Sequence, residues 1–176
     1  MSGATRRPER YLGPRPGVSF PQHANNVVPL QTVISGEFRI NSGTIPIGVA
    51  PFQGNVVDAF ISVNNCGRDD SNPLRMSGEV YINGTTIFTT IPCINANSET
   101  AGTAKTTAKH TDATNTTTGF DTGVTAGVLA GVDSGTPVSF KKGDVFTAKL
   151  FVTRTATPTT EISNVGVVVV LDPDYI

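Results

Sequence analysis

An alternation of apolar and polar residues with a period of two limits the folds that this chain can adopt. It is clearest in Phe146–Thr153, which directly follows a polar turn at Phe140–Asp144. A period of two places every second side chain on the same face of a β-strand. No stretch shows a convincing helical period, and abundant Thr, Gly, Asn and Val favour strands and turns over helices. The sequence therefore predicts an all-β fold.

A β-hairpin is predicted in the middle of the chain. Val80–Ile82 and Thr85–Phe88 are separated by Asn83–Gly84, the residue pair that best tolerates the positive φ angles of a type I′ turn. In the register of a two-residue turn, Tyr81 lies opposite Thr86. This is the most specific local prediction that the sequence allows.

Further short strands are predicted, and their residues are Val27–Ile34, Glu37–Ile40, Thr44–Val49, Val57–Val63 and Val165–Leu171. Pro46 restricts its strand to a sheet edge or a bulge. The last run contains five Val and one Leu, which predicts cover on both faces, by the facing sheet and by a loop or a neighbouring subunit. Eight or so short strands separated by turn signals predict a β-sandwich or jelly roll over residues 27–176.

Residues 1–26 differ from the rest of the chain. Four prolines interrupt them, no apolar period fits, and four arginines stand against one glutamate. We expect an extended basic arm without a core of its own, either solvated or held by a partner. Arginines can form bidentate contacts with carboxylates, and prolines lower the entropy cost of docking an extended segment.

A second unusual segment spans about residues 92–123. It is rich in Thr, Asn and Ala and almost lacks apolar residues before Phe120. A connection of this length within a compact domain is usually functional or contact-making. We expect it to run over the outer surface or along a subunit boundary.

The composition excludes several classes of function. Charged residues make up 15% and the formal net charge is −1, so the whole molecule has no general attraction to nucleic acid or anionic membranes. No secretory leader or membrane-spanning run is apparent, which predicts a soluble protein made in the cytosol. Cys66 and Cys93 are expected to be lone thiols, with a disulfide bridge between them as the alternative.

No catalytic or metal-binding constellation is apparent in the sequence. His23 and His110 lack partners at ligand spacing, and no serine lies in a nucleophile elbow. Glu79 and Glu161 are expected to be surface acids rather than a glycosidase pair. Aspartate-rich stretches lack the ligand spacing of a calcium loop. We therefore expect neither enzymatic activity nor a cofactor.

A family resemblance adds a specific expectation. Val138–Leu150 combines a polar Gly-Asp turn with a long alternating strand, and Val165–Leu171 closes the chain with a Val-rich strand. Together with the central hairpin, this arrangement resembles trimeric jelly-roll domains over about residues 50–172. The low-charge composition and the proline-rich arm look most like the head decoration, or cement, proteins of tailed bacteriophages.

The resemblance implies a homotrimer on the virion surface that stabilises the capsid by bridging major capsid subunits. The charge balance and hydropathy predict no membrane partner and disfavour nucleic acid, and we expect no small-molecule partner. The predicted capsid contacts of the arm are Arg6, Arg7, Arg10, Tyr11, Leu12, Arg15 and Phe20. The predicted subunit-contact residues of the Thr-rich segment are Lys105, Lys109, His110 and Phe120. The alternative is a receptor-binding head of a tail fibre or spike that binds host glycan through loops such as Asn64–Asn72 or Thr100–Thr118.

Overall fold

The computed structural model describes residues 27–69, 73–96, 102–108, 110–111, 118–119, 123–131, 135–154 and 158–173. These residues contain strands and turns and no helix. The all-β prediction is therefore confirmed. The strands are β1 Val28–Glu37, β2 Ile45–Val49, β3 Gly54–Asn65, β4 Arg75–Ile82, β5 Thr85–Thr86, β6 Phe88–Thr90, β7 Cys93–Asn95, β8 Lys105–Thr106, β9 His110–Thr111, β10 Thr118–Gly119, β11 Val124–Thr125, β12 Val128–Leu129, β13 Val138–Phe140, β14 Val145–Thr153 and β15 Ser163–Pro173.

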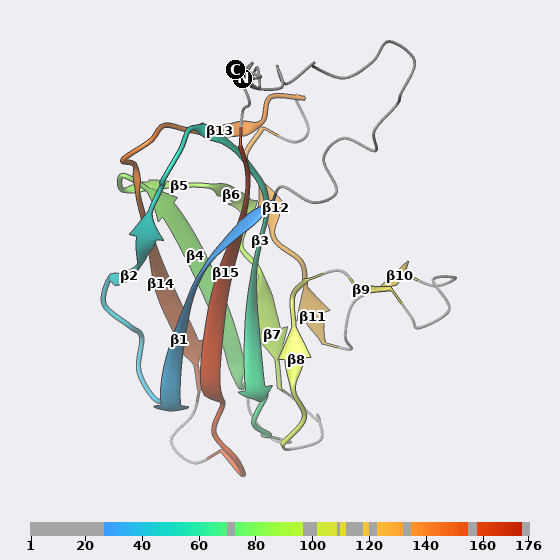
Figure 1. Cartoon of the computed structure of the whole chain (residues 1–176). Coiled ribbons are helices and arrows are strands. Elements are labelled where there is room, and N and C mark those ends of the chain that lie inside the picture. The colour runs from blue at the N-terminus through green and yellow to red at the C-terminus, as the bar shows by residue number, and fades with distance from the viewer. Residues whose placement is uncertain are drawn as a thin grey trace, which may run out of the picture.

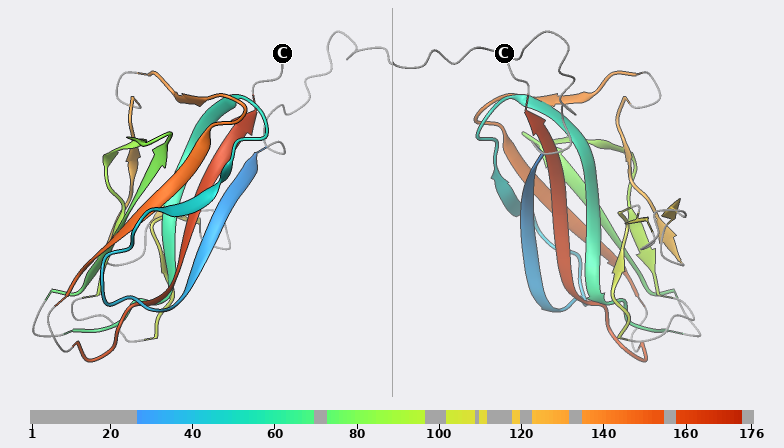
Figure 2. Two further views of the ribbon diagram at one scale, coloured as in Figure 1. Left: turned by 90° about the vertical axis from the view of Figure 1, so that its left-hand side faces the viewer. Right: turned by 45° about the vertical axis from the view of Figure 1, so that its right-hand side comes forward.

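The strands form two principal sheets with a nested order. Sheet A has the order β1-β15-β3-β13, with β8 also paired to β3, and sheet B has the order β11-β7-β4-β14-β2, with β5 paired to β4. The antiparallel pairs β1–β15, β2–β14, β3–β8 and β4–β7 join the first strand to the last and work inward along the chain. This nested pairing of eight strands is a jelly roll. In Figure 1, β1, β15 and β3 lie in front of β4 and β14, and Figure 2 shows the two layers from other sides.

The core lies between the two sheets. On β14, Phe146, Ala148 and Leu150 are buried, and on β15 every second residue from Val165 to Leu171 is buried. Antiparallel sheets that pack face to face bury alternate residues in this way. The period of two that identified these strands in the sequence thus marks the residues that fill the sandwich.

The predicted hairpin forms with the predicted register. Tyr81 pairs with Thr86, and the φ angles of Asn83 and Gly84 are 49° and 86°. Asn83 also fixes the neighbouring turn, because its side-chain amide donates to Asp144 at 2.8 Å and its carbonyl accepts from the backbone amide of residue 145 at 2.9 Å. Two turns from distant parts of the sequence are therefore joined at one end of sheet B.

One other prediction is changed by the structure. The Thr-rich segment does not lie wholly outside the sandwich, because β7 and β8 are two of the eight nested strands and Cys93, Ile94 and Ala96 are buried.

Pro46, as predicted, lies on an edge strand, where β2 pairs with β14 across a register shift. On Val165–Leu171 one side is buried, but Val168 and Val170 on the other side are only half-buried. The cover predicted for that second side is not complete within the described residues.

Candidate functional site

The outward surfaces of the two sheets differ in chemistry. On sheet B, Glu79 pairs across the strands with Lys149, and the Tyr81 hydroxyl donates a hydrogen bond to Glu79. The Lys149 ammonium lies 5.2 Å from the centroid of the Tyr81 ring. Desolvation and the Glu79 carboxylate together raise the pKa of Tyr81 to about 12. This surface is charged and internally paired, as expected of a solvated sheet face.

The outward surface of sheet A is almost uncharged. The residues of β1, β15 and β3 that point outward form three cross-strand rows, Pro29–Val170–Asp58, Gln31–Val168–Phe60 and Val33–Gly166–Ser62. We call these nine residues the sheet A face. Asp58 is its only ionisable residue, and Val33 is 67% exposed. An outward surface of this composition is typical of a contact surface.

A hollow of about 370 Å³ lies at the lower end of the sheet A face, lined by Val33, Gly166, Ser62 and neighbouring residues. Gly166 interrupts a run of valines in the middle of β15, and a Cβ at this position would lie 2.8 Å from the Ser62 hydroxyl oxygen. Glycine inside a strand is unfavourable and often marks a close approach by another chain or ligand. Here it keeps the surface between β1 and β3 recessed.

Two carboxylates lie at the other end of the same face, which is uppermost in Figure 1 and is where Val28 pairs with Leu171. Burial raises the pKa of Asp58, although a hydrogen bond from the backbone amide of Ala59 opposes the effect. Asp172 follows β15 residue Leu171, and its Oδ1 atom is buried without a hydrogen-bond partner among the described residues. Buried acceptors are nearly always paired, so this oxygen needs an explanation.

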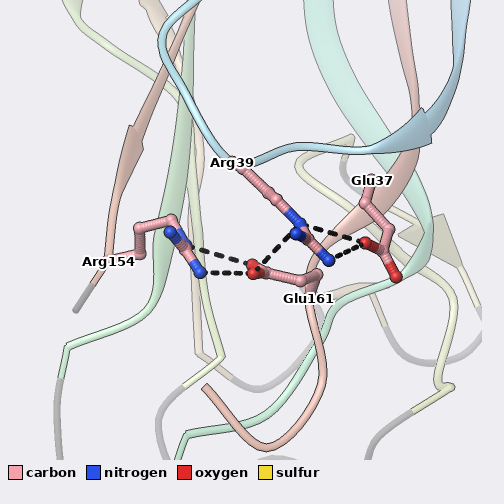
Figure 3. A network of polar contacts seen from close by, with 4 residues as sticks. All are labelled: Glu37, Arg39, Arg154 and Glu161. Carbon is pink, nitrogen blue, oxygen red and sulfur yellow. Dashed lines mark hydrogen bonds and ion pairs between the residues drawn. The ribbon is translucent and has the colours of Figure 1, made fainter. Parts of the chain in front are cut away.

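A separate network of four charged residues lies at the opposite end of the sandwich (Figure 3). Glu161 accepts hydrogen bonds from Arg154, whose Nε is 3.2 Å from the carboxylate, and lies 3.6 Å from the Nε of Arg39. Arg39 also binds Glu37 at 2.7 Å. Glu161 is only 9% exposed, so the prediction that it is a surface acid is wrong. The network joins the start of β15 to the ends of β1 and β14. Its role is therefore structural.

The structure places few of the contact residues predicted from the sequence. All seven arm residues lie outside the described residues, as do Lys109 and Phe120, and for His110 only the backbone is described, in β9. Lys105 is 5% exposed, on β8 opposite Val63. Its contact with another subunit stays a prediction. Cys66 and Cys93 are both buried, and no disulfide joins them.

The described residues bring together no cluster suited to metal chemistry. They hold no group of three or more His, Cys, Asp or Glu side chains that could bind a metal ion. The described residues also contain no helix that is long and apolar enough to cross a bilayer.

The fold and the sheet A face define an all-β jelly-roll domain with one charged and one nearly uncharged surface. No known family model matches the chain, and no curated protein matches it either.

Proposed function

We propose that this chain is a structural subunit of a virion, a capsid decoration protein that stabilises a phage head by bridging major capsid subunits. The observation that carries the proposal is the sheet A face, a nearly uncharged and largely apolar surface on a jelly roll. The arm joins the domain at β1, the edge strand of the same sheet. The apolar surface and the basic, proline-rich segment that precedes β1 in the sequence offer two contact elements.

The chemistry of the two surfaces supports an orientation on the capsid. Sheet B carries paired charges that remain favourably hydrated in water, whereas burial of Val33, Val168 and Phe60 would remove apolar area from water at roughly 25 cal/mol per Å². Sheet A would therefore face the capsid lattice and sheet B the solvent. Major capsid protein is the proposed partner, and three copies of the chain would form one decoration unit.

Cosedimentation with particles of the phage that encodes the chain tests this proposal. Removal of residues 1–22 is expected to abolish binding while leaving the thermal unfolding transition of the domain in place. Val33→Asp on the sheet A face is expected to weaken binding, and Val49→Asp is the matched control, because Val49 is similarly exposed at 56% but belongs to sheet B. Undiminished binding by the truncated protein would refute a capsid-binding role for residues 1–26.

Glycan binding by a tail-fibre or spike head is the second candidate function, and the structure offers it less support. Sugar sites commonly stack the ligand on an aromatic ring, but Lys149 already lies over Tyr81 on the sheet B surface. A glycan array separates the two functions. Specific binding to an oligosaccharide, unaffected by Val33→Asp, would favour the receptor-binding role.

A further inference from the structure

The unpaired Asp172 oxygen is the first sign that the sheet A face is incomplete. Its Oδ1 atom is buried without a partner in the described part of the chain, and Asp58 lies on the same face, opposite Val170. A buried carboxylate oxygen is unfavourable unless a donor reaches it. The upper end of the face therefore presents an acidic position that a cationic donor would complete.

The rest of the face points to an extended, partly apolar occupant. Val168, Val170 and Phe60 lie half-buried in the middle, and the hollow beside Gly166 lies two residues below Val168. Acidic at one end and apolar along its length, the face fits a segment that carries both arginines and scattered apolar side chains.

Residues 1–26 of this chain have that composition and join the face directly. They hold four arginines against a single glutamate, together with Tyr11, Leu12 and Phe20. Val28 pairs with Leu171, so this segment enters the sheet beside Asp172. Arg15 precedes Val28 by 13 residues, or about 43 Å of extended chain. That length allows an excursion of about 20 Å down the face and back. The residues between Arg15 and Val28 can therefore cover the upper part of the face, beside the ten-residue strand β1, while Arg15 returns to Asp172.

From this continuity and charge complementarity we infer that residues 1–26 bind the sheet A face of their own molecule, with an arm arginine paired to Asp172. A tethered segment acts at an effective concentration in the millimolar range, which favours the chain's own arm over that of a second copy. The inference concerns the protein free of any capsid. On a particle, major capsid protein would displace the arm from the sheet A face and leave both free for capsid contacts. The test therefore requires no capsid, and its outcome is separate from that of the cosedimentation experiment.

The test uses the full chain with a nitroxide spin label on Ser19→Cys, next to Phe20. The native thiols are both buried, so the label selects the introduced one. Paramagnetic broadening is measured on valine methyl groups of the full chain by NMR. We expect the Val33 and Val168 methyls to broaden strongly and the Val49 and Val145 methyls of sheet B to broaden little. Equal broadening on both sheets would overturn the inference.

Charge variants separate docking from accidental proximity. Asp172→Asn is expected to lower the ratio of docked to undocked arm by about tenfold, as for loss of a charge-assisted hydrogen bond. Asp144→Asn removes a carboxylate at the end of sheet B and is expected to change nothing on the sheet A face. If the methyl broadening is the same in Asp172→Asn as in the parent protein, the pairing of an arm arginine with Asp172 is contradicted.

A mixing experiment identifies which molecule supplies the arm. Spin-labelled protein without isotopes is combined with isotope-labelled protein without the spin label. Absence of broadening in this mixture supports docking within one chain. Broadening that appears in the mixture at the strength seen in the single sample would overturn it in favour of arm exchange between copies.

Discussion

Replacement of Glu161 by Gln tests whether the charged network holds the base of the sandwich together. Glu161 is 9% exposed and is shared by Arg154 and Arg39, so the substitution leaves two guanidinium groups around a neutral amide. Loss of one partner from a fully buried ion pair costs roughly 3–5 kcal/mol. Because the Arg154 side chain is 20% exposed, water replaces part of the interaction. We expect Glu161→Gln to lower the free energy of unfolding by about 2 kcal/mol.

Urea denaturation of the full chain measures this loss. With a slope of about 2 kcal/mol per M, the midpoint is expected to fall by about 1 M while the slope is unchanged. Glu37→Gln is the matched control in the same network, because Glu37 and Arg39 are 54% and 63% exposed and such pairs contribute about 0–1 kcal/mol. If the two variants lose the same stability, burial of Glu161 does not determine the strength of the network, and the reasoning fails.

Three further predictions concern single sites. Hydrogen bonds from the Lys141 backbone amide and the Asn83 side chain lower the pKa of Asp144 below its ordinary value of 3.8. The ionised carboxylate therefore stabilises the fold at neutral pH, and this stabilisation is lost as the pH falls through the lowered pKa. Thermal unfolding measured against pH should show Asp144→Asn destabilised at pH 7 and close to the parent protein in acid. Ultraviolet titration should find a phenol with a pKa of about 12, and Glu79→Gln should lower the pKa of Tyr81. Gly84→Ala places a Cβ at a φ of 86° and should cost about 1 kcal/mol in urea denaturation, without loss of the fold.

The sequence predicted those parts of the fold that depend on local backbone rules. The hairpin at Asn83–Gly84 was predictable because few residue pairs accept positive φ at two adjacent positions. The strands β7 and β8 were missed because they have only three and two residues, too few to display a period. Lys105–Thr106 is also polar, although Lys105 is buried, so nothing in those residues indicates a strand of the jelly roll.

The charged network lay beyond sequence reasoning for a different reason. Arg39, Arg154 and Glu161 follow or precede three different strands, and only the nested pairing of the jelly roll brings them together. A glutamate in a loop rich in Thr and Pro resembles any solvated acid until its neighbours are known. Sequence patterns give the periodicity of each element, but they do not give the partners that determine whether a charge is buried.

The valine run of β15 connects the sequence to the proposed interface. Five valines predicted cover on two sides, and the described chain fully buries only one of them. An apolar sheet surface beside a long edge strand whose only charged residue is its last, Glu37, is an aggregation hazard. The edge of β1 is protected by Pro29 near its start and by a register shift at Gly36, whose amide donates to Asn164 at 2.9 Å. The described residues provide no equivalent protection for the face itself, so a covering segment or partner is the remaining way to keep it from uncontrolled association.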